Sequence, residues 1–372
     1  MKYVDEYRDP AMAEHLIEEI RRLAEEPISI MEICGGHTHA IFRAGIDQVL
    51  EPQIRFLHGP GCPVCVTPIE KIDRAIALAR RPKTIIATYG DMLRVPGSES
   101  TLLKEKAKGA QVKMVYSSLD AVALAEKHPD FEVVFFAVGF ETTIPANGFS
   151  ILRARELGLR NYSVLCNHVL VPPVIRFLLE DPDVQIDAFI GPGHVGTVVG
   201  SEDYRFIAEE FGRPVVISGF EPNDILQSVY MILKQRQEGR RQVEIQYSRA
   251  VKPEGNVRAR AVLNRIFEPV DQEWRGIGTI PRSGMAIREE FRDYDAEFKF
   301  QSALTLSPAQ ESPACICGEI TKGVKEPWQC ESFGTACTPD NPIGTCMVSS
   351  EGTCAAYYKY QFLKRAAGGM LG

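Results

Sequence analysis

Short runs of β-branched and other apolar residues alternate with helical patterns between residues 28 and 247, and this alternation restricts the fold more than any other feature. Helical patterns such as 69–80 and 203–212 separate the apolar runs. Strands that alternate with helices pair in parallel, because each crossover helix returns the chain to the same end of the sheet. The sequence therefore predicts an α/β fold with parallel sheets and helices on both faces. The expected strands are 28–33, 54–58, 84–89, 112–116, 133–138, 163–167, 186–190, 214–218 and 242–247.

Two stretches of the chain share one pattern. Cys34 ends an expected strand, and a Gly-Pro-Gly sequence begins 25 residues later at 59–61. Cys166 also ends an expected strand, and a second Gly-Pro-Gly begins 25 residues later at 191–193. We interpret the shared offset as an internal duplication, which predicts two similar parallel-sheet α/β domains that face one another across a cleft.

The composition changes after about residue 295. Residues 307–354 are rich in Pro, Gly, Ser, Thr and Cys and have little apolar periodicity. Such a segment cannot build its own core and needs covalent or metal staples. We expect it to belong to a loop-rich iron–sulfur domain that also packs with the N-terminal helix, which Asp9 caps and Pro10 begins. The expected domains are 28–140, 141–262, and 1–27 together with 263–372.

Charge and hydropathy exclude several classes of protein. The net charge is −7, with acidic and basic residues interspersed, which argues against a nucleic-acid partner. No apolar run reaches the roughly 18 residues of a membrane span, and the charged N-terminal segment does not resemble a secretion signal. We therefore expect a cytoplasmic protein. In that reducing compartment, ten cysteines favour metal ligation or redox chemistry over a disulfide framework.

Several chemically useful segments follow expected strands. In open parallel sheets, ligands bind beyond the carboxyl ends of the strands. We therefore expect these segments to meet on one rim or in one cleft. They are Cys34, the two Gly-Pro-Gly loops, Gly139-Phe140-Glu141 and Asn167-His168.

Six of the cysteines lie between Cys315 and Cys354, with the spacing C-x-C-x12-C-x6-C-x8-C-x7-C. Four thiolates could bind zinc or an iron–sulfur cluster. Structural zinc usually takes paired C-x2–4-C ligands, whereas widely spaced single ligands suit a cubane cluster better. An iron–sulfur cluster is favoured, with zinc and disulfides as alternatives. The spacing does not select four cysteines from the six.

The stretch HGPGCPVC places Cys62 and Cys65 after the turn that contains Gly61. Residues 67–70 read as a capping box with Pro68 at the first helical position. The positive end of a helix lowers the pKa of a nearby thiol, so we expect thiolate character here. A redox dithiol is favoured over two zinc ligands or two inert turn cysteines.

The stretch CGGHTH allows three interpretations. A thiolate from Cys34 and an imidazole from His37 or His39 form a typical pair of ligands for a transition metal. Alternatively, His37 activates Cys34 as a nucleophile, or the thiol is merely packed beside capping histidines. Gly35 and Gly36 leave backbone amides open to a small ligand.

Glu141 follows the most apolar of the expected strands. Its carboxylate is expected at the edge of the sheet, partly removed from water. It could act as an acid, a base or a hydrogen-bond acceptor for His37, or it could serve only as a carboxylate at the start of a helix.

Four motifs together resemble the HypD family of [NiFe]-hydrogenase maturation factors, and the resemblance covers the whole chain. They are CGGHTH at 34–39, GPGCPVCVTP at 59–68, GFETT at 139–143, and C-x14-C-x6-C-x16-C. The last spacing assigns the ligands of a [4Fe-4S] cluster to Cys315, Cys330, Cys337 and Cys354. It leaves Cys317 and Cys346 as a possible disulfide or as free thiols.

The resemblance implies a scaffold for assembly of the Fe(CN)2CO unit of the hydrogenase. The iron would lie between Cys34 and the N-terminal cysteine of a partner, HypC. Cyanide would come from HypE, which carries a thiocyanate on its C-terminal cysteine. Cys62 and Cys65 would exchange electrons with the [4Fe-4S] cluster.

Two other functions remain alternatives. One is a self-contained thiol–disulfide oxidoreductase that resembles ferredoxin:thioredoxin reductase. The other is a zinc-stapled binding module without redox chemistry.

Overall fold

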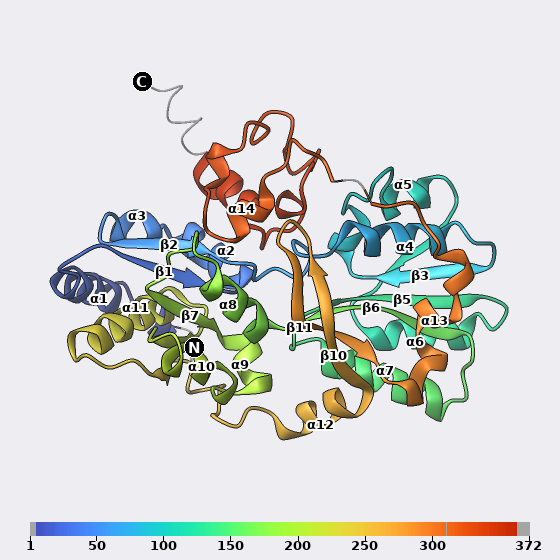
Figure 1. Ribbon diagram of the computed structural model, residues 1–372, viewed down its shortest axis with the longest axis horizontal. Helices are drawn as coiled ribbons and strands as arrows, with labels where there is room; N and C mark the ends of the chain where they lie inside the picture. The colour runs from blue at the N-terminus through green and yellow to red at the C-terminus, as the bar shows by residue number, and fades with distance from the viewer. Residues whose placement is uncertain (1–4, 310, 363–372) are drawn as a thin grey trace.

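The computed structural model describes residues 5–309 and 311–362 of the chain. Two β-sheets lie side by side, each between layers of helices, and the cysteine-rich C-terminal segment lies above their junction (Figure 1). The α/β class predicted from the sequence is confirmed.

The first sheet is parallel throughout and has the strand order β2-β1-β7-β8-β9. Helices α1, α2, α3 and α11 pack on one face, and α8, α9 and α10 cover the other. The strands are β1 (Ile28–Glu32), β2 (Ile54–His58), β7 (Ala188–Pro192), β8 (Val215–Ser218) and β9 (Val243–Ile245). The helices are α1 (Pro10–Leu23), α2 (Gly35–Ala44), α3 (Ile46–Leu50), α8 (Val171–Glu180), α9 (Gly193–Val199), α10 (Arg205–Glu209) and α11 (Pro222–Gln237).

The second sheet has the order β10-β11-β6-β5-β3-β4. Four of its strands are parallel, and β11 joins β6 and β10 in antiparallel pairing. The strands are β3 (Thr84–Thr88), β4 (Gln111–Met114), β5 (Glu132–Gly139), β6 (Tyr162–Val169), β10 (Phe267–Trp274) and β11 (Gly278–Ile287). One face is covered by α6 (Ser118–Lys127), α7 (Ile144–Glu156) and α12 (Val257–Ile266), and the other by α4 (Ile69–Ala79), α5 (Leu102–Ala107) and α13 (Ala296–Lys299).

The two halves of the molecule do not follow the expected domain boundaries. The first sheet combines strands from 28–58 with strands from 188–245, and the second combines 84–169 with 267–287. The expected domains 28–140 and 141–262 each contain strands of both sheets, so this division of the chain is corrected. The apolar runs correctly mark strands, but they carry no information on which sheet each strand joins.

The expected internal duplication also differs from the structure. The strand that ends before Cys34 and the strand before the first Gly-Pro-Gly are neighbours in one sheet. The corresponding strands of the supposed copy, β6 and β7, lie in different sheets. The shared offset therefore does not reflect a shared topology.

The N-terminal helix begins at Pro10, and the Asp9 side chain accepts hydrogen bonds from the backbone amides of Ala11 and Met12, as expected. Its apolar residues Leu16 and Ile20 pack into the core of the first sheet. Among the described residues, α1 packs against α11 and α3, so its apolar face is not placed against the C-terminal segment as expected.

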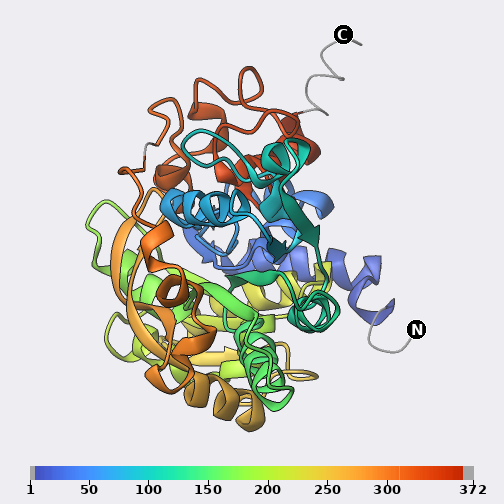
Figure 2. The ribbon, with the colours of Figure 1, turned by 90° about the vertical axis from the view of Figure 1, so that its right-hand side faces the viewer.

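The C-terminal segment is loop-rich, as predicted. Besides short helical turns it contains α14 (Cys317–Thr321) and α15 (Thr353–Tyr357). Both Figure 1 and the perpendicular view in Figure 2 place it above the sheets. Among the described residues, none of the helices has the length and apolar character needed to cross a membrane.

Candidate functional site

A cavity of about 340 Å³ lies where the carboxyl ends of the two sheets meet. Cys34, Gly36 and Gly61 reach it from the first sheet, and Gly139 to Thr143, with the exception of Glu141, reach it from the second. Much of the wall is apolar, formed by side chains such as Met92, Phe140 and Val195. The expected convergence is therefore present for Cys34, the two Gly-Pro-Gly loops and Gly139-Phe140, and it draws on both sheets. Asn167 and His168 do not line the cavity.

His194 and Glu351 also line this cavity, although neither was among the expected site residues. His194 directly follows the second Gly-Pro-Gly, so its place after a strand was a signal that the sequence offered. Burial lowers the pKa of His194, which favours a neutral imidazole. Burial raises the pKa of Glu351, with further contributions from Asp91 and Glu32.

Cys34 is the N-cap residue of α2 and is partly exposed at the cavity wall. Burial, followed by the carboxylates of Glu32 and Glu351, raises the pKa of the Cys34 thiol to about 12, although the amides of Gly36 and His37 lower it. The thiol is therefore protonated at neutral pH. A cation that binds the sulfur would displace this proton, because metals bind the thiolate.

Glu32 is fully buried at the end of β1 and holds the Cys34 backbone. Its carboxylate accepts hydrogen bonds from the Cys34 amide at 2.8 Å and from the Thr38 hydroxyl. The Nδ1 atom of buried His58 lies 2.8 Å from the same carboxylate. Glu32 was not among the expected site residues, and its only signal in the sequence is a charged residue inside an apolar strand.

The glycines around Cys34 allow close packing. A Cβ atom at Gly61 would lie 2.2 Å from the Cys34 nitrogen, and a Cβ atom at Gly35 would lie 2.4 Å from Cβ of Glu351. The Gly35 amide donates to the Gly61 carbonyl at 3.0 Å. The absence of side chains at these glycines therefore lets the loop of residues 34–36 pack closely against the loop of residues 59–61, in addition to any role of their amides in binding a ligand.

The expected partnership of His37 and Glu141 is absent. His37 is buried, and its Nε2 atom lies 2.9 Å from the Gly219 carbonyl oxygen. Glu141 does not line the cavity, and its carboxyl group accepts a hydrogen bond from the Val171 amide at 2.9 Å. Burial raises the pKa of Glu141 to about 8, so this side chain is a neutral acid at neutral pH.

His39 also lies outside the cavity lining. Its Nε2 atom is 3.1 Å from the Tyr360 hydroxyl, and its Nδ1 atom is 3.4 Å from the Ser350 carbonyl oxygen. The second histidine of CGGHTH therefore joins α2 to the C-terminal segment.

Cys62 and Cys65 are buried in one core with the C-terminal cysteines. Burial, together with hydrogen bonds to the thiols of Cys346 and Cys62, raises the pKa of Cys65 above its usual value. The expected thiolate character of Cys65 is therefore wrong. The expected capping box is also absent, because α4 begins at Ile69 after an N-cap residue, Pro68, whose side chain makes no cap bond.

Thr67 makes other contacts instead. Its hydroxyl donates to the Pro63 carbonyl at 2.8 Å and accepts from the Asn167 side-chain amide at 3.1 Å. The loop that carries the C-x-x-C pair is thus fastened to β6 of the second sheet.

The C-terminal cysteines form a network of thiols around Cys346, whose side chain interacts with those of Cys317, Cys354 and Cys65. The Cys337 sulfur accepts a hydrogen bond from the Ile343 amide at 3.4 Å, a contact typical of cluster ligands. The thiol-rich, water-poor surroundings therefore fit an iron–sulfur cluster. Among the described residues, no group of three or more His, Cys, Asp or Glu side chains is placed to hold a single metal ion.

Cys166 and His168 lie in the core of the second sheet. The Cys166 thiol donates to the Met285 carbonyl at 3.1 Å and lies 3.2 Å from Nδ1 of His168, whose Nε2 atom is 2.7 Å from the Asn147 amide. Burial raises the pKa of Cys166 to about 12. These contacts favour a buried structural thiol.

Comparison with known proteins agrees with the motifs. The family HypD, described as "Hydrogenase formation hypA family", matches residues 11–361. The chain is 51% identical to hydrogenase maturation factor HypD2 of Bradyrhizobium diazoefficiens, over 97% of each chain. It is 52% identical to hydrogenase maturation factor HypD of Azotobacter vinelandii, over 97% of each, and 45% identical to that of Escherichia coli K12, over 97% of this chain and 98% of the relative. With matches of this length and identity, the chain belongs to the HypD family of hydrogenase maturation factors.

Proposed function

We propose that this chain is the scaffold on which the Fe(CN)2CO unit of [NiFe]-hydrogenase is assembled, with Cys34 as the protein's own ligand to the iron. The observation that carries the proposal is the position of the Cys34 thiol at the wall of a largely apolar cavity between the two sheets. A soft thiolate suits an iron that binds cyanide and carbon monoxide. The volume of about 340 Å³ falls in the range of small-molecule sites, which leaves room for a second sulfur from a partner.

We infer that HypC supplies this second sulfur and that HypE delivers cyanide as a thiocyanate. When the thiocyanate S–C bond breaks, the carbon leaves with the bonding electrons as cyanide and binds the iron. The sulfur of HypE then needs two electrons to become a thiolate. The Cys62–Cys65 dithiol provides two electrons and two protons when it closes to a disulfide.

The buried position of the dithiol supports this role. The raised pKa of Cys65 keeps its proton on the sulfur, so electrons and protons leave together. Cys65 also contacts the thiol of Cys346 in the C-terminal segment. This thiol provides a route by which the Cys62–Cys65 disulfide can be reduced again. All ten cysteines are unpaired, as a reducing, cytoplasmic setting would require.

A [4Fe-4S] cluster would supply single electrons to this thiol network when bound. We assign its ligands to the cysteines that match the C-x14-C-x6-C-x16-C spacing, namely Cys315, Cys330, Cys337 and Cys354. Cys317 and Cys346 then remain available as thiols between this segment and Cys65, as their side-chain interaction indicates.

The experiment that tests the scaffold is infrared spectroscopy of the chain co-purified anaerobically with HypC. We expect cyanide and carbonyl stretching bands that disappear in Cys34→Ala and persist in Cys166→Ala. The second variant is a control for the loss of a thiol, because Cys166 lies within β6 in the core of the second sheet, outside the cavity lining. Bands that persist in Cys34→Ala would refute the scaffold.

The iron content per chain tests the ligand assignment separately. We expect alanine at any of the four assigned cysteines to remove the cluster iron and its absorbance near 400 nm, and Cys317→Ala to retain both. Equal loss in Cys317→Ala would mean that the choice of four is wrong.

A self-contained thiol–disulfide oxidoreductase is the second candidate function, favoured by the contact of Cys65 with both Cys62 and Cys346. This function requires the dithiol but not Cys34. Disulfide reductase activity that is lost in Cys62→Ser and unchanged in Cys34→Ala, without iron-bound cyanide, would support it.

A further inference from the structure

The ring of Phe220 lies between the imidazole of His194, which lines the cavity, and that of buried His37. The centroid of His37 is 4.4 Å from that of Phe220 with an angle of 18° between the rings, and His194 lies at 3.9 Å and 22°. Two rings cannot occupy one face of a phenyl group at these distances without overlap. His37 and His194 therefore stack on opposite faces of Phe220.

Phe220 also lies directly beside the Cys34 loop. A Cβ atom at Gly36 would lie 3.0 Å from Cε1 of Phe220 and 3.6 Å from Sγ of Cys34. The second glycine of CGGHTH thus leaves the space into which the Phe220 ring fits. A shift of this ring would move both imidazoles and the loop that carries the sulfur.

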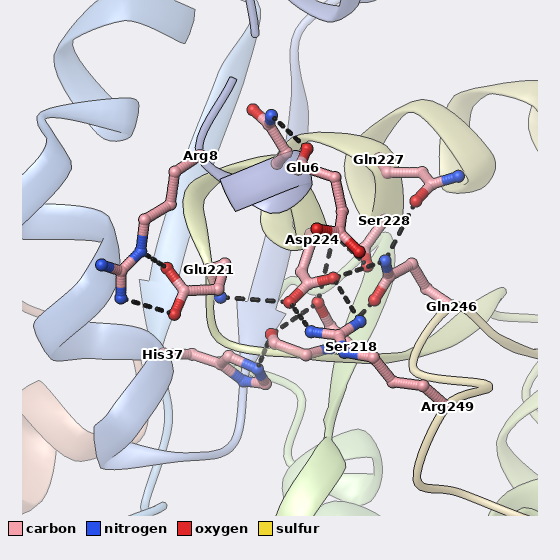
Figure 3. Close-up of polar contacts among 12 residues, drawn as sticks. Glu6, Arg8, His37, Ser218, Glu221, Asp224, Gln227, Ser228, Gln246 and Arg249 are labelled. Atoms are coloured by element: carbon pink, nitrogen blue, oxygen red, sulfur yellow. Dashed lines mark hydrogen bonds and ion pairs between the residues drawn. The ribbon is translucent and has the colours of Figure 1, made fainter. Parts of the chain in front are cut away.

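A buried ion pair fixes the loop that carries Phe220. Asp224 is fully buried, and Arg249 binds its two carboxylate oxygens at 2.8 and 2.6 Å. Gln246 donates to Asp224 at 2.7 Å, and its side-chain oxygen accepts from the Gly219 amide at 3.0 Å. The Gly219 backbone next to Phe220 is therefore held by the buried network around Asp224 (Figure 3).

The N-terminal segment strengthens this support. The Arg249 guanidinium lies 3.8 Å from the centre of the Tyr7 ring. Arg8 pairs with Glu221 through two contacts of 2.5 and 2.7 Å (Figure 3). Residues far apart in the sequence thus contact the short loop of residues 219–221, which carries Phe220.

We propose that Phe220 is a positioning residue for iron-unit assembly, which holds the imidazoles of His37 and His194 in fixed orientations next to the loop that carries Cys34. His37 Nε2 is already engaged by the Gly219 carbonyl, so its ring is fixed from both sides. The stacked ring of Phe220 orients the imidazole of His194, which lines the cavity. This inference rests on the proposed function of the cavity.

The test compares Phe220→Leu, which removes the aromatic ring, with Phe220→Tyr, which retains it. Phe211→Leu is the matched control, because Phe211 is a partly buried aromatic that packs on Phe206, outside the cavity lining. The first readout is the NMR shift of the Cε1 protons of His37 and His194 in histidine-labelled protein, which the ring current of Phe220 displaces. The second is the intensity of the cyanide infrared bands in the complex with HypC.

We expect Phe220→Leu to lose the ring-current shifts and to weaken the bands by about fivefold or more, as a misplaced site would. Phe220→Tyr and Phe211→Leu should keep both signals. Full bands in Phe220→Leu after loss of the shifts would overturn the inference. Weak bands in both Phe220→Leu and Phe220→Tyr, together with a lower melting temperature, would also overturn it, because the role would then be structural. Bands that survive in Cys34→Ala would instead refute the proposed function.

Discussion

Gly61→Ala should move the loop of residues 59–61 away from the loop of residues 34–36 and thereby displace Cys34. The new Cβ atom would lie 2.2 Å from the Cys34 nitrogen and 2.5 Å from its Cα, and both are backbone atoms. Ordinary contact begins at 3.4 Å, so the loops must move apart by about 1.2 Å. No rotamer change can relieve the contact, because neither atom belongs to a side chain.

The cost follows from two contributions. Forcing one methyl group into a close-packed site costs about 1 to 3 kcal/mol, and loss of the hydrogen bond from Gly35 to Gly61 adds about 1 kcal/mol. An unfolding entropy of about 2.1 cal/mol/K per residue then gives a fall in melting temperature of about 3 to 5 °C. A displacement of about 1 Å at a reacting group can reduce activity by about 100-fold. The intensity of the cyanide bands should therefore fall strongly, although the melting temperature falls by only a few degrees.

Calorimetry and infrared spectroscopy of the same preparation measure both effects. The matched control is Gly90→Ala, whose new Cβ atom would meet only the flexible Met114 side chain, with the nearest atom at 3.2 Å. We expect this control to change stability by less than about 0.5 kcal/mol and to keep the bands. A Gly61→Ala protein with the melting temperature and bands of the parent would refute the packing argument.

Three further predictions follow from buried groups. Glu141→Gln tests the carboxyl group whose pKa is raised to about 8. Relative to the variant, the parent should lose about 1.4 kcal/mol of unfolding free energy per pH unit as the pH rises from about 5 to 8, because only the unfolded state ionises in this window. A difference in unfolding free energy between parent and variant that is the same at pH 5 and pH 8 would contradict this. Arg249→Met should lower the free energy of unfolding, measured with denaturant, by about 3 to 5 kcal/mol, because it leaves the Asp224 carboxylate buried without its partner. A decrease below about 1 kcal/mol would contradict the importance of this ion pair. Cys346→Ala should slow reduction of the C-x-x-C disulfide by dithionite, measured by thiol labelling, and an unchanged rate would show that electrons take another route.

The strands and the N-terminal helix could be predicted because their signals are local. Apolar β-branched runs mark β1 to β9, and Asp9 with Pro10 marks the start of α1. The antiparallel strands β10 and β11 were not among the expected strands, because β10 is largely exposed and polar. The position of Cys34 at a cavity could also be predicted, since residues that follow parallel strands share one edge of the sheet.

Features that depend on long-range packing could not be predicted in this way. The motif around Thr67 and Glu70 has the residues of a capping box, but Thr67 bonds to Pro63 and Asn167 instead. Burial also reversed the effect expected from the helix N-terminus on the pKa of Cys65. Phe220 gave no signal, because its importance comes from two histidines that lie far away in the sequence.

The sheets exchange strands along the chain, and this has a consequence for genetic dissection. The chain passes from the first sheet to the second between β2 and β3, and this passage contains Cys62 and Cys65. A continuous gene fragment that contains either sheet in full therefore also contains part of the other. Deletion mapping would unfold both halves at once, so only point substitutions can assign separate tasks to them.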